Sequence, residues 1–553
     1  MDSVYERALN EIGDNGKFQK RFDFIFNFIF TLLWAMAYNS MILALVIIPY
    51  SCKLPSKPDN ISEFDWKSKY IPISTDAAGK TSFSSCQIYI SPDENNATKE
   101  CDAYFYNRTW YESTVPSENN WVCDNELNVA NIFAYGKIGE AIGSVIFGWF
   151  GDTHGRRLAY ISSLCLLVIG RFISILSSHN YILFAIGCII AWFPSWTVEQ
   201  SVTVISMEIS AQERRSKITI LRTIGYSTGM CIMPLLFWWL RDWKTFMIVT
   251  TLTQIPFLLF SWNILESPRW LWVEGKGKAC IKELNRIAKV NNTALEKDTK
   301  DELLTTKKTQ SIQALGPLSL FSGWRLALHT SLQLYLWVSV TLGYVVLIMS
   351  SGEKSDGNPF LEFAWQSVAE VPATFIGAWL ADNFGRRYAG AASFSLSALM
   401  WIIIFFKEYG AGTWLDKWWV GSTLVIINRF STTVSYYVIY LLNMEIYPTC
   451  LRQSGIALGN VFASSGSAIA PYLMYMARLK ALRKAMRDGG RSAGAILFVV
   501  TLLGAVSVLL LPETLNATLP ETIKDAREFG RRGDDEYEPV KMKMVSTVSK
   551  DND

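Results

Sequence analysis

The chain has 553 residues, of which 50% are apolar and only 18% are charged, and its formal net charge is +3. Soluble globular proteins carry about 25% charged residues, so this composition predicts a membrane protein. The near-neutral charge gives no electrostatic argument for a nucleic-acid partner. A total of three histidines argues against a metal site built from histidine clusters.

Twelve stretches of the chain are apolar over about 20 residues, the length at which a helix spans a hydrocarbon core. They fall as six stretches, a polar interval at residues 274–323, and six more. The first is too long for a cleaved signal peptide, and no small-residue cleavage site follows it. The predicted spans are 22–49, 129–150, 158–176, 182–207, 218–240, 246–265, 324–350, 360–381, 388–406, 418–442, 454–476 and 493–511.

The distribution of Lys and Arg predicts the orientation of these spans. Basic residues gather after the second, fourth and eighth spans, in HGRRL, QERRSK and GRRY. The positive-inside rule therefore places these connections, the central interval and both termini in the cytoplasm. The basic segment ARLKALRKAMR, residues 477–487, is an exception, because the same count places it outside and the sequence gives no reason for it.

Residues 51–128 then form an extracellular loop. An even number of cysteines in an oxidising compartment predicts disulfides, and four cysteines allow three pairings. Asn-x-Ser/Thr sequons in the same loop are expected to carry glycans, whereas the cytoplasmic sequons at Asn291 and Asn516 should stay unmodified. The residues concerned are Cys52, Cys86, Cys101 and Cys123, and Asn60, Asn96 and Asn107.

One motif occurs twice, as GWFGDTHGRR at 148–157 and AWLADNFGRR at 378–387, each time closing the second span of a half. A single copy would be an ordinary positive-inside turn, but two copies in register with six spans each indicate an internal repeat. MEISAQERR pairs with MEIYPTCLR in the same way, and ESPRWL with PETL. We expect their charged residues to form gating ion-pair networks at the cytoplasmic ends. These are Asp152, Arg156, Arg157, Glu208, Arg215, Glu266, Arg269, Asp382, Arg386, Arg387, Glu445, Arg452 and Glu513.

These motifs resemble those of the major facilitator superfamily, and the resemblance covers residues 18–515. The long first outer loop, with ESPRWL and EIYPTCLRQSG, is similar to the organic cation, anion and carnitine transporter family. Sugar porters share the gating motifs, but their first outer loop is short. The resemblance implies an all-α membrane protein with twelve transmembrane helices in two pseudo-symmetric six-helix bundles, a central site near the bilayer midplane and transport by alternating access. It also implies a multi-pass protein of the plasma membrane.

The domains expected on this basis are a cytoplasmic N-terminus at 1–21, an N-terminal bundle at 22–265, a cytoplasmic central loop at 266–323, a C-terminal bundle at 324–511 and a cytoplasmic tail at 512–553.

Charged residues inside spans are costly and suggest functional sites. Glu370, in SVAEVPATF, stands where the family's cation and carnitine carriers have Glu-hydrophobic-Pro, which implies a partner for a cargo ammonium. The alternative is an ion pair inside the bundle. Arg429 falls where family members carry a basic residue, so it binds a cargo carboxylate or pairs with Glu370.

Lys137 lies one helical turn before Glu140, so the two neutralise each other, or Lys137 offers its charge to a cargo carboxylate. Ser464 occupies a position where the family's cation carriers have Asp and its anion and carnitine carriers have Arg. A neutral residue there disfavours dications and dianions. A small zwitterion such as β-alanine or a carnitine-like betaine fits best, with a monovalent cation as the alternative.

Three aromatic residues complete the expected cargo site. Trp337 and Tyr344, seven positions apart, share one helix face of a span that resembles the family's substrate-facing span. Tyr437 stands where family members place a cargo contact. An aromatic face attracts an ammonium, although any of these rings could instead serve packing.

The leading hypothesis is therefore a transporter of small organic zwitterions or cations, acting as a monomer without a cofactor. The alternatives are a polyspecific organic cation transporter and a membrane sensor that binds solute without moving it. No phosphate loop indicates a primary pump, and no nucleophile–base pair indicates an enzyme. The driving force is the solute gradient, the membrane potential or a coupled ion that the sequence does not identify.

Overall fold

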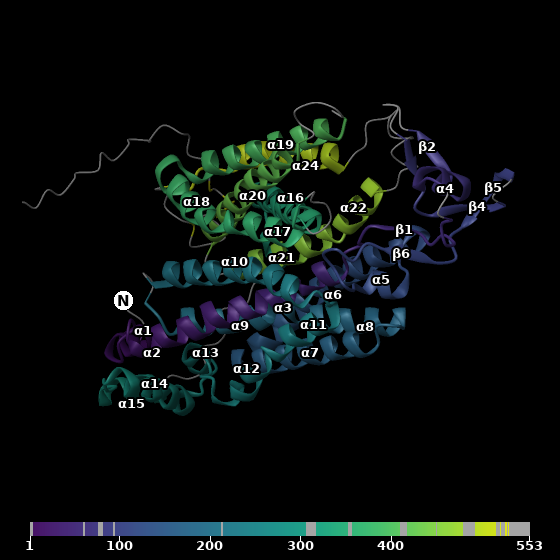
Figure 1. Cartoon of the computed structure of the whole chain (residues 1–553). Helices are drawn as coiled ribbons and strands as arrows, with labels where there is room; N and C mark the ends of the chain where they lie inside the picture. Colours follow the sequence, from purple (N-terminus) through teal and green to yellow (C-terminus); the bar gives the residue numbers. More distant parts are fainter. Residues whose placement is uncertain are drawn as a thin grey trace, which may run out of the picture.

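A computed structural model provides the structure. It is mostly helical, and the central helices of two segments far apart in the chain face each other (Figure 1). The residues that it describes are 4–58, 61–75, 81–91, 94–211, 214–305, 317–351, 357–409, 417–448, 451–478, 493–515, 520, 526–527 and 529.

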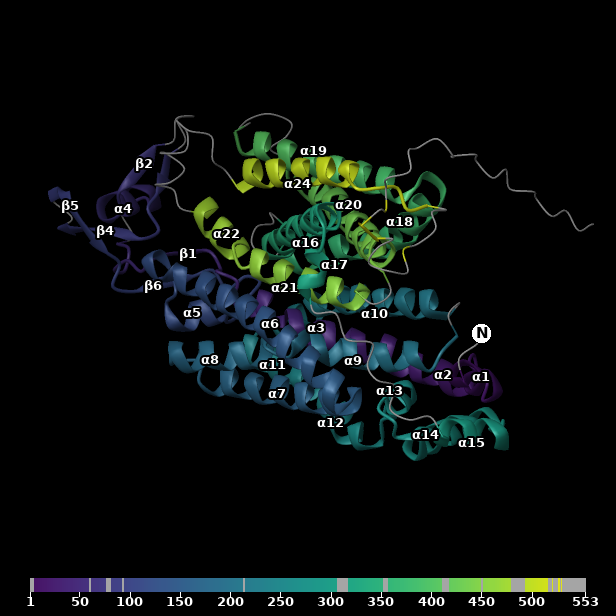
Figure 2. The same cartoon turned by 180° about the vertical axis from the view of Figure 1, so that it is seen from behind.

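The spanning helices form two layers, one from each half of the chain, and opposite views show the same arrangement (Figures 1 and 2). Each predicted span coincides with a helix or with consecutive helices. The N-terminal half contains α2 (Lys17–Phe22), η1 (Asp23–Phe30), α3 (Thr31–Ala44), α6 (Leu127–His154), α7 (Arg156–Leu176), α8 (Tyr181–Trp192), α9 (Ser195–Glu208), α10 (Arg215–Leu240), α11 (Trp243–Leu252) and α12 (Ile255–Phe260). The C-terminal half contains α16 (Trp324–Ser351), α17 (Pro359–Val368), α18 (Glu370–Phe384), α19 (Arg386–Tyr409), α20 (Trp418–Ile446), α21 (Arg452–Ser467), α22 (Ala470–Arg478) and α24 (Ala493–Leu510).

Four of the spans are broken into two helices close to a proline. The breaks fall between α8 and α9, α11 and α12, α17 and α18, and α21 and α22. Proline has no N–H to donate to the carbonyl four residues earlier, and its ring clashes with that carbonyl, so a helix ends or kinks there. The prolines concerned are Pro194, Pro256, Pro372 and Pro471.

Within the described residues, nine helices are long and apolar enough to cross a membrane. The three spans outside that set are α6 and the broken pairs α17–α18 and α21–α22. These are also the spans that carry Lys137, Glu140, Glu370 and Ser464. Part of the predicted central site therefore lies on these three spans, and the rest lies on α16 and α20, which are among the nine apolar helices.

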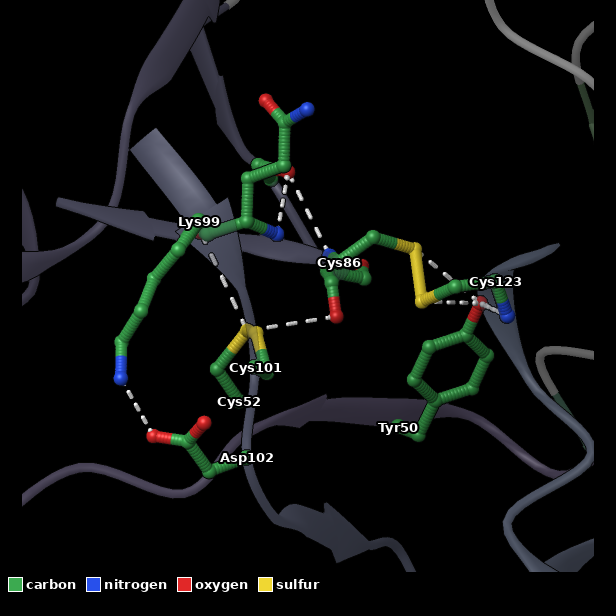
Figure 3. The surroundings of a disulfide bond; sticks show 10 residues. Tyr50, Cys52, Cys86, Lys99, Cys101, Asp102 and Cys123 are labelled. Atoms are coloured by element: carbon green, nitrogen blue, oxygen red, sulfur yellow. Dashed lines mark hydrogen bonds and ion pairs between the residues drawn. A yellow bond between two sulfur atoms is a disulfide. The ribbon is translucent and has the colours of Figure 1, made fainter. Parts of the chain in front are cut away.

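The end of the molecule that carries residues 50–126, called the loop end, contains three short two-stranded antiparallel sheets and two disulfides. Cys52 pairs with Cys101 and Cys86 with Cys123, which selects one of the three pairings open from the sequence (Figure 3). The Tyr50 hydroxyl lies 3.6 Å from Cys86 Sγ. The elements here are β1 (Tyr50–Cys52), α4 (Glu63–Tyr70), β2 (Ile73–Thr75), β3 (Thr81–Phe83), β4 (Gln87–Ser91), β5 (Glu94–Glu100), β6 (Tyr104–Tyr106), α5 (Val115–Asn119) and η2 (Cys123–Glu126), with β1 paired to β6, β2 to β3 and β4 to β5.

The opposite end, called the motif end, carries the helices of the central interval and the N-terminal helix. Asn291 joins them: its side-chain oxygen accepts from the Phe18 amide at 2.9 Å, and its amide nitrogen donates to the carbonyls of Ile12 and Gly13. This sequon side chain is fully engaged in packing, as expected for an unmodified site. The elements are α1 (Val4–Glu11), η4 (Ser261–Asn263), α13 (Pro268–Val273), α14 (Gly277–Asn291), α15 (Lys297–Thr305) and η5 (Pro317–Phe321).

Candidate functional site

Glu370 is a buried carboxylate in the first turn of α18. Pro372 cannot donate to the carbonyl of Val368, so the span breaks at Ala369 and a new helix begins at Glu370. The positive end of a helix dipole favours a carboxylate at this position. The Tyr344 hydroxyl of α16 donates to the two carboxylate oxygens, at 3.2 and 3.4 Å.

Arg429 of α20 is the cationic partner of Glu370. Its Nη2 lies 3.1 Å from Glu370 Oε1, and the arginine side chain is 0% exposed. Its Nη1 donates to Ser367 Oγ at 3.2 Å, and the guanidinium lies 5.3 Å from the centre of the Phe363 ring. The structure therefore shows the ion pair inside the bundle that the sequence left open as an alternative.

The N-terminal half contains a comparable pair on α6. Lys137 Nζ lies 3.1 Å from Glu140 Oε2, with the Glu140 side chain only 2% exposed. Glu140 also accepts from the Tyr38 hydroxyl at 2.7 Å and from the Trp196 indole N–H. Mutual neutralisation, the simpler interpretation of this spacing, is the arrangement in this conformation.

Both of these carboxylates also contact the opposite half of the molecule. Ser464 of α21, in the C-terminal half, donates to Glu140 Oε1 at 3.0 Å. Ser227 of α10, in the N-terminal half, donates to Glu370 Oε2 at 3.5 Å. The two acids therefore lie at the boundary between the halves, where a change in their relative position alters the contacts of both.

A third ion pair joins α9 and α10, where Arg222 Nη1 lies 3.1 Å from Glu199 Oε2. Beyond it, a buried pair that sequence analysis missed joins Asp23 of η1 to Arg214 at 2.5 Å. Arg171 of α7 is a second missed residue: it is 3% exposed and donates to Ser40, with no carboxylate partner among the described residues. The signal for Asp23 and Arg171 was present, because each is a charge inside a predicted apolar span.

Of the three aromatic residues predicted for the site, one lies beside Glu370 and two do not. Tyr344 contacts Glu370, but Trp337 packs inside the C-terminal half, 2% exposed and edge-on to Tyr436 at 5.4 Å. Tyr437 lies against Gly377 and within electrostatic reach of the motif-end charges. The structure instead places its neighbour Tyr436 within electrostatic reach of the central residues, because consecutive residues of a helix point about 100° apart.

The repeated motif builds a similar network in each half of the chain. Arg156 Nη2 lies 3.0 Å from Asp152 Oδ1, one turn earlier. The helix-end amides of Arg156 and Arg157 donate to Glu266, at 2.9 and 3.1 Å, so Glu266 caps helix α7. Ser267 in turn donates to Glu208.

The C-terminal copy repeats the contacts of the arginine side chain with the aspartate and of the helix-end amides with a glutamate, and it adds an ion pair from Arg386 to Glu445. Arg386 pairs with Asp382 at 3.5 Å and with Glu445 at 3.1 Å, and the amides of Arg386 and Arg387 donate to Glu513 at 2.9 and 3.0 Å. Both connections turn on a glycine with positive φ, 104° at Gly155 and 92° at Gly385. Among the described residues, each ion pair of these networks stays within one half, so these pairs stiffen the individual bundles in this conformation.

The halves do meet at the loop end. Tyr111 of the loop packs against Phe360 of the C-terminal half at 4.8 Å and Phe237 of the N-terminal half at 5.5 Å. Burial raises the pKa of Tyr111 above its ordinary value. The Tyr472 hydroxyl donates to Asn131 Oδ1 at 2.9 Å across the same boundary. These contacts join the two halves at the loop end.

Several predicted residues lie outside what the structure describes. This holds for Asn60 and Asn516, for the side chains of Asn96, Arg215 and Arg452, and for residues 479–492, which include most of the basic segment 477–487. Asn107 is exposed, as a glycan acceptor must be, and Arg269 is exposed beside the N-terminal gating cluster.

Residues 82–525 match the family described as Sugar (and other) transporter. The chain belongs to this family of the major facilitator superfamily. Solute carrier family 22 member 7 of Mus musculus is 27% identical over 96% of this chain and 98% of its own length. The organic cation/carnitine transporter 2 of Homo sapiens is 25% identical over 76% of this chain and 73% of its own.

Solved structures of major facilitator proteins show the same fold. The xylose transporter XylE from E. coli, in a partially occluded inward open conformation, gives a TM-score of 0.55 at 15% identity and covers 90% of this chain and 100% of that chain. The proton:xylose symporter XylE bound to 6-bromo-6-deoxy-D-glucose gives 0.52 at 18% identity, over 72% and 89%. The predicted fold class and the prediction of a membrane transporter rather than an enzyme are thus confirmed.

Proposed function

We propose that the protein carries small organic zwitterions across the membrane by alternating access at the boundary between its halves. The observation that supports this most directly is charge balance. Among the described central residues, each of three carboxylates has one cationic partner, so the site carries both signs and no net charge. The pairs are Glu370–Arg429, Glu140–Lys137 and Glu199–Arg222.

A site that contains both charges but has no net charge favours a cargo that also carries both charges and no net charge. In a low-dielectric interior, an unpaired charge is costly, so a net cation or anion would leave one protein charge without a partner. A zwitterion brings both signs and leaves the sum at zero. β-Alanine and carnitine-like betaines have this chemistry, and the similar human protein is named organic cation/carnitine transporter 2, after a solute of this kind. Tyr344 adds a hydroxyl beside the acid.

The loop end is the extracellular side of the plasma membrane in this proposal, and both termini are cytoplasmic. Disulfides gather at the loop end, and the exposed Asn107 is accessible there to glycosylation. The conformation described here, closed by Tyr111 and by the Asn131–Tyr472 bond, is then the one closed to the outside. One chain supplies both halves of the site, so a monomer is sufficient.

A polyspecific organic cation transporter is the second candidate. The buried acids Glu370 and Glu140 favour it, as does the similarity to the organic cation transporter protein of Drosophila melanogaster, 25% identical over 96% of this chain. A sensor that binds without translocating is the third, and the matched gating clusters in both halves argue against it because a sensor needs no such pair.

Uptake into proteoliposomes separates these functions. Labelled β-alanine is offered with carnitine, tetraethylammonium or a dicarboxylate as competitor. We expect saturable accumulation in the lumen, released by permeabilisation and inhibited by carnitine more strongly than by the other two. Dominant inhibition by tetraethylammonium would instead identify a cation carrier. Binding without lumenal accumulation would identify a sensor.

A further inference from the structure

The ammonium of Lys137 occupies a place that suits the ammonium of a ligand. Its Nζ lies 3.1 Å from Glu140 Oε2, donates to the Tyr38 hydroxyl at 2.7 Å and stands 5.2 Å from the centre of the Tyr38 ring. Tyr38 is stacked on Trp34 at 5.1 Å, with the two ring planes only 12° apart. An acid, a hydroxyl and an aromatic ring are the groups that proteins use to bind organic ammonium ions.

Glu140 is held in place independently of Lys137. Three neutral donors from three helices reach its carboxylate: the Tyr38 hydroxyl of α3 at 2.7 Å, the Trp196 indole N–H of α9 and the Ser464 hydroxyl of α21 at 3.0 Å. The acid therefore keeps its position when its cation leaves. Lys137 is the exchangeable partner, since its side chain is 17% exposed against 2% for Glu140, and a lysine ammonium sits on a flexible stem.

We propose that Glu140 is an ammonium-binding subsite of the N-terminal half, filled in this conformation by the protein's own Lys137, and that Lys137 sets the charge class of the cargo. The cargo ammonium replaces Lys137 at Glu140, and the released Lys137 pairs with the cargo carboxylate. A cation without a carboxylate also reaches Glu140, but it leaves Lys137 unpaired near the membrane interior, which opposes its binding.

The bond from Ser464 gives the exchange a consequence for the opposite half. Ser464 is on the C-terminal half and Glu140 on the N-terminal half, so a ligand that competes for this carboxylate also competes with a contact across the boundary. The inference rests on the proposed transport function and adds to it the residue that discriminates a zwitterion from a cation.

The test compares two solutes of nearly the same shape, β-alanine and its amide β-alaninamide, which lacks the carboxylate. Binding to purified protein and uptake into proteoliposomes are measured for wild type, Lys137→Met, Lys137→Arg and Glu140→Gln. The matched control is Lys244→Met, because Lys244 pairs with Glu118 at the loop end, away from the site. Thermal melting shows whether each variant is folded.

We expect wild type, Lys137→Arg and Lys244→Met to prefer β-alanine. Lys137→Met should reverse the preference, losing affinity for β-alanine and gaining it for β-alaninamide by at least about tenfold each. Glu140→Gln should weaken both solutes. A Lys137→Met protein that is folded but keeps the wild-type preference, or loses both solutes equally, overturns the inference. If wild type takes up neither these solutes nor any member of the competition panel, the proposed function itself is refuted.

Discussion

The pairing of Glu370 with Arg429 leads to a quantitative prediction for Glu370→Gln. Glutamine keeps the shape of the side chain and its contacts with Tyr344 and Ser227, but it removes the negative charge beside Arg429, which is 0% exposed. A hydrogen bond to a charged group contributes about 1.5–3 kcal/mol. Loss of one such charged interaction at the binding site should weaken solute binding roughly 10- to 150-fold.

The variant also leaves Arg429 without its anion in the bundle, and breaking a buried pair costs about 3–5 kcal/mol. We therefore expect a lower melting temperature in addition to weaker binding. Binding is measured by scintillation proximity on purified protein, and uptake in proteoliposomes with matched protein content. The control is Glu362→Gln, since Glu362 lies on α17 near the loop end and accepts from Ser422 instead. Wild-type affinity and uptake in Glu370→Gln would refute the assignment of Glu370 to the site.

Three further predictions concern other parts of the molecule. Gly385→Ala should lower the melting temperature and slow uptake, because φ is 92° there and a Cβ would lie 2.5 Å from Glu513 Oε2, a strain of about 1–3 kcal/mol. The control Gly148→Ala adds a Cβ inside helix α6 with nothing within 4 Å, so it should lower neither the melting temperature nor the uptake rate. Cys280 should resist iodoacetamide at pH 8 until the protein unfolds, since burial raises its pKa to about 12 and the thiol therefore stays protonated at pH 8. Labelling of Cys280 in the folded protein would contradict this. Asn107→Gln should remove one glycan-dependent shift on gels of protein from eukaryotic cells, whereas Asn291→Gln should cause no such shift and instead destabilise the motif end; a glycan on Asn291 would reverse the assigned orientation.

The sequence was sufficient to predict the elements that repeat. Hydropathy located the spans, and the two copies of the Gly-Arg-Arg motif predicted matching connections, which the structure builds with matching contacts at Glu266 and Glu513. Hydropathy also revealed the charged residues of the proposed central site, because a charged residue is conspicuous within an apolar span. Asp23 and Arg171 were equally visible, and they were missed because no repeat or motif drew attention to them.

The partners of these residues could not be predicted in the same way. Periodicity describes one helix at a time, whereas the contacts of Glu140 come from three other helices and from both halves. The rotation and crossing angles of these helices depend on packing that a single sequence does not display. Tyr436 and Tyr437 show the limit: a difference of one residue on α20 separates a ring near the central charges from one beside the gating cluster.

The central claim is that the two halves must move relative to each other for solute to cross. Asn131 and Tyr472 face each other across the loop end, with 2.9 Å between Oδ1 and the hydroxyl. Replacing both with cysteine and joining them with a short bifunctional methanethiosulfonate reagent should lock this end closed. Uptake into proteoliposomes should stop on crosslinking and return on reduction, while wild type and both single-cysteine variants pass through the same treatment unaffected. Undiminished uptake by the fully crosslinked protein would contradict transport by opening and closing between the halves.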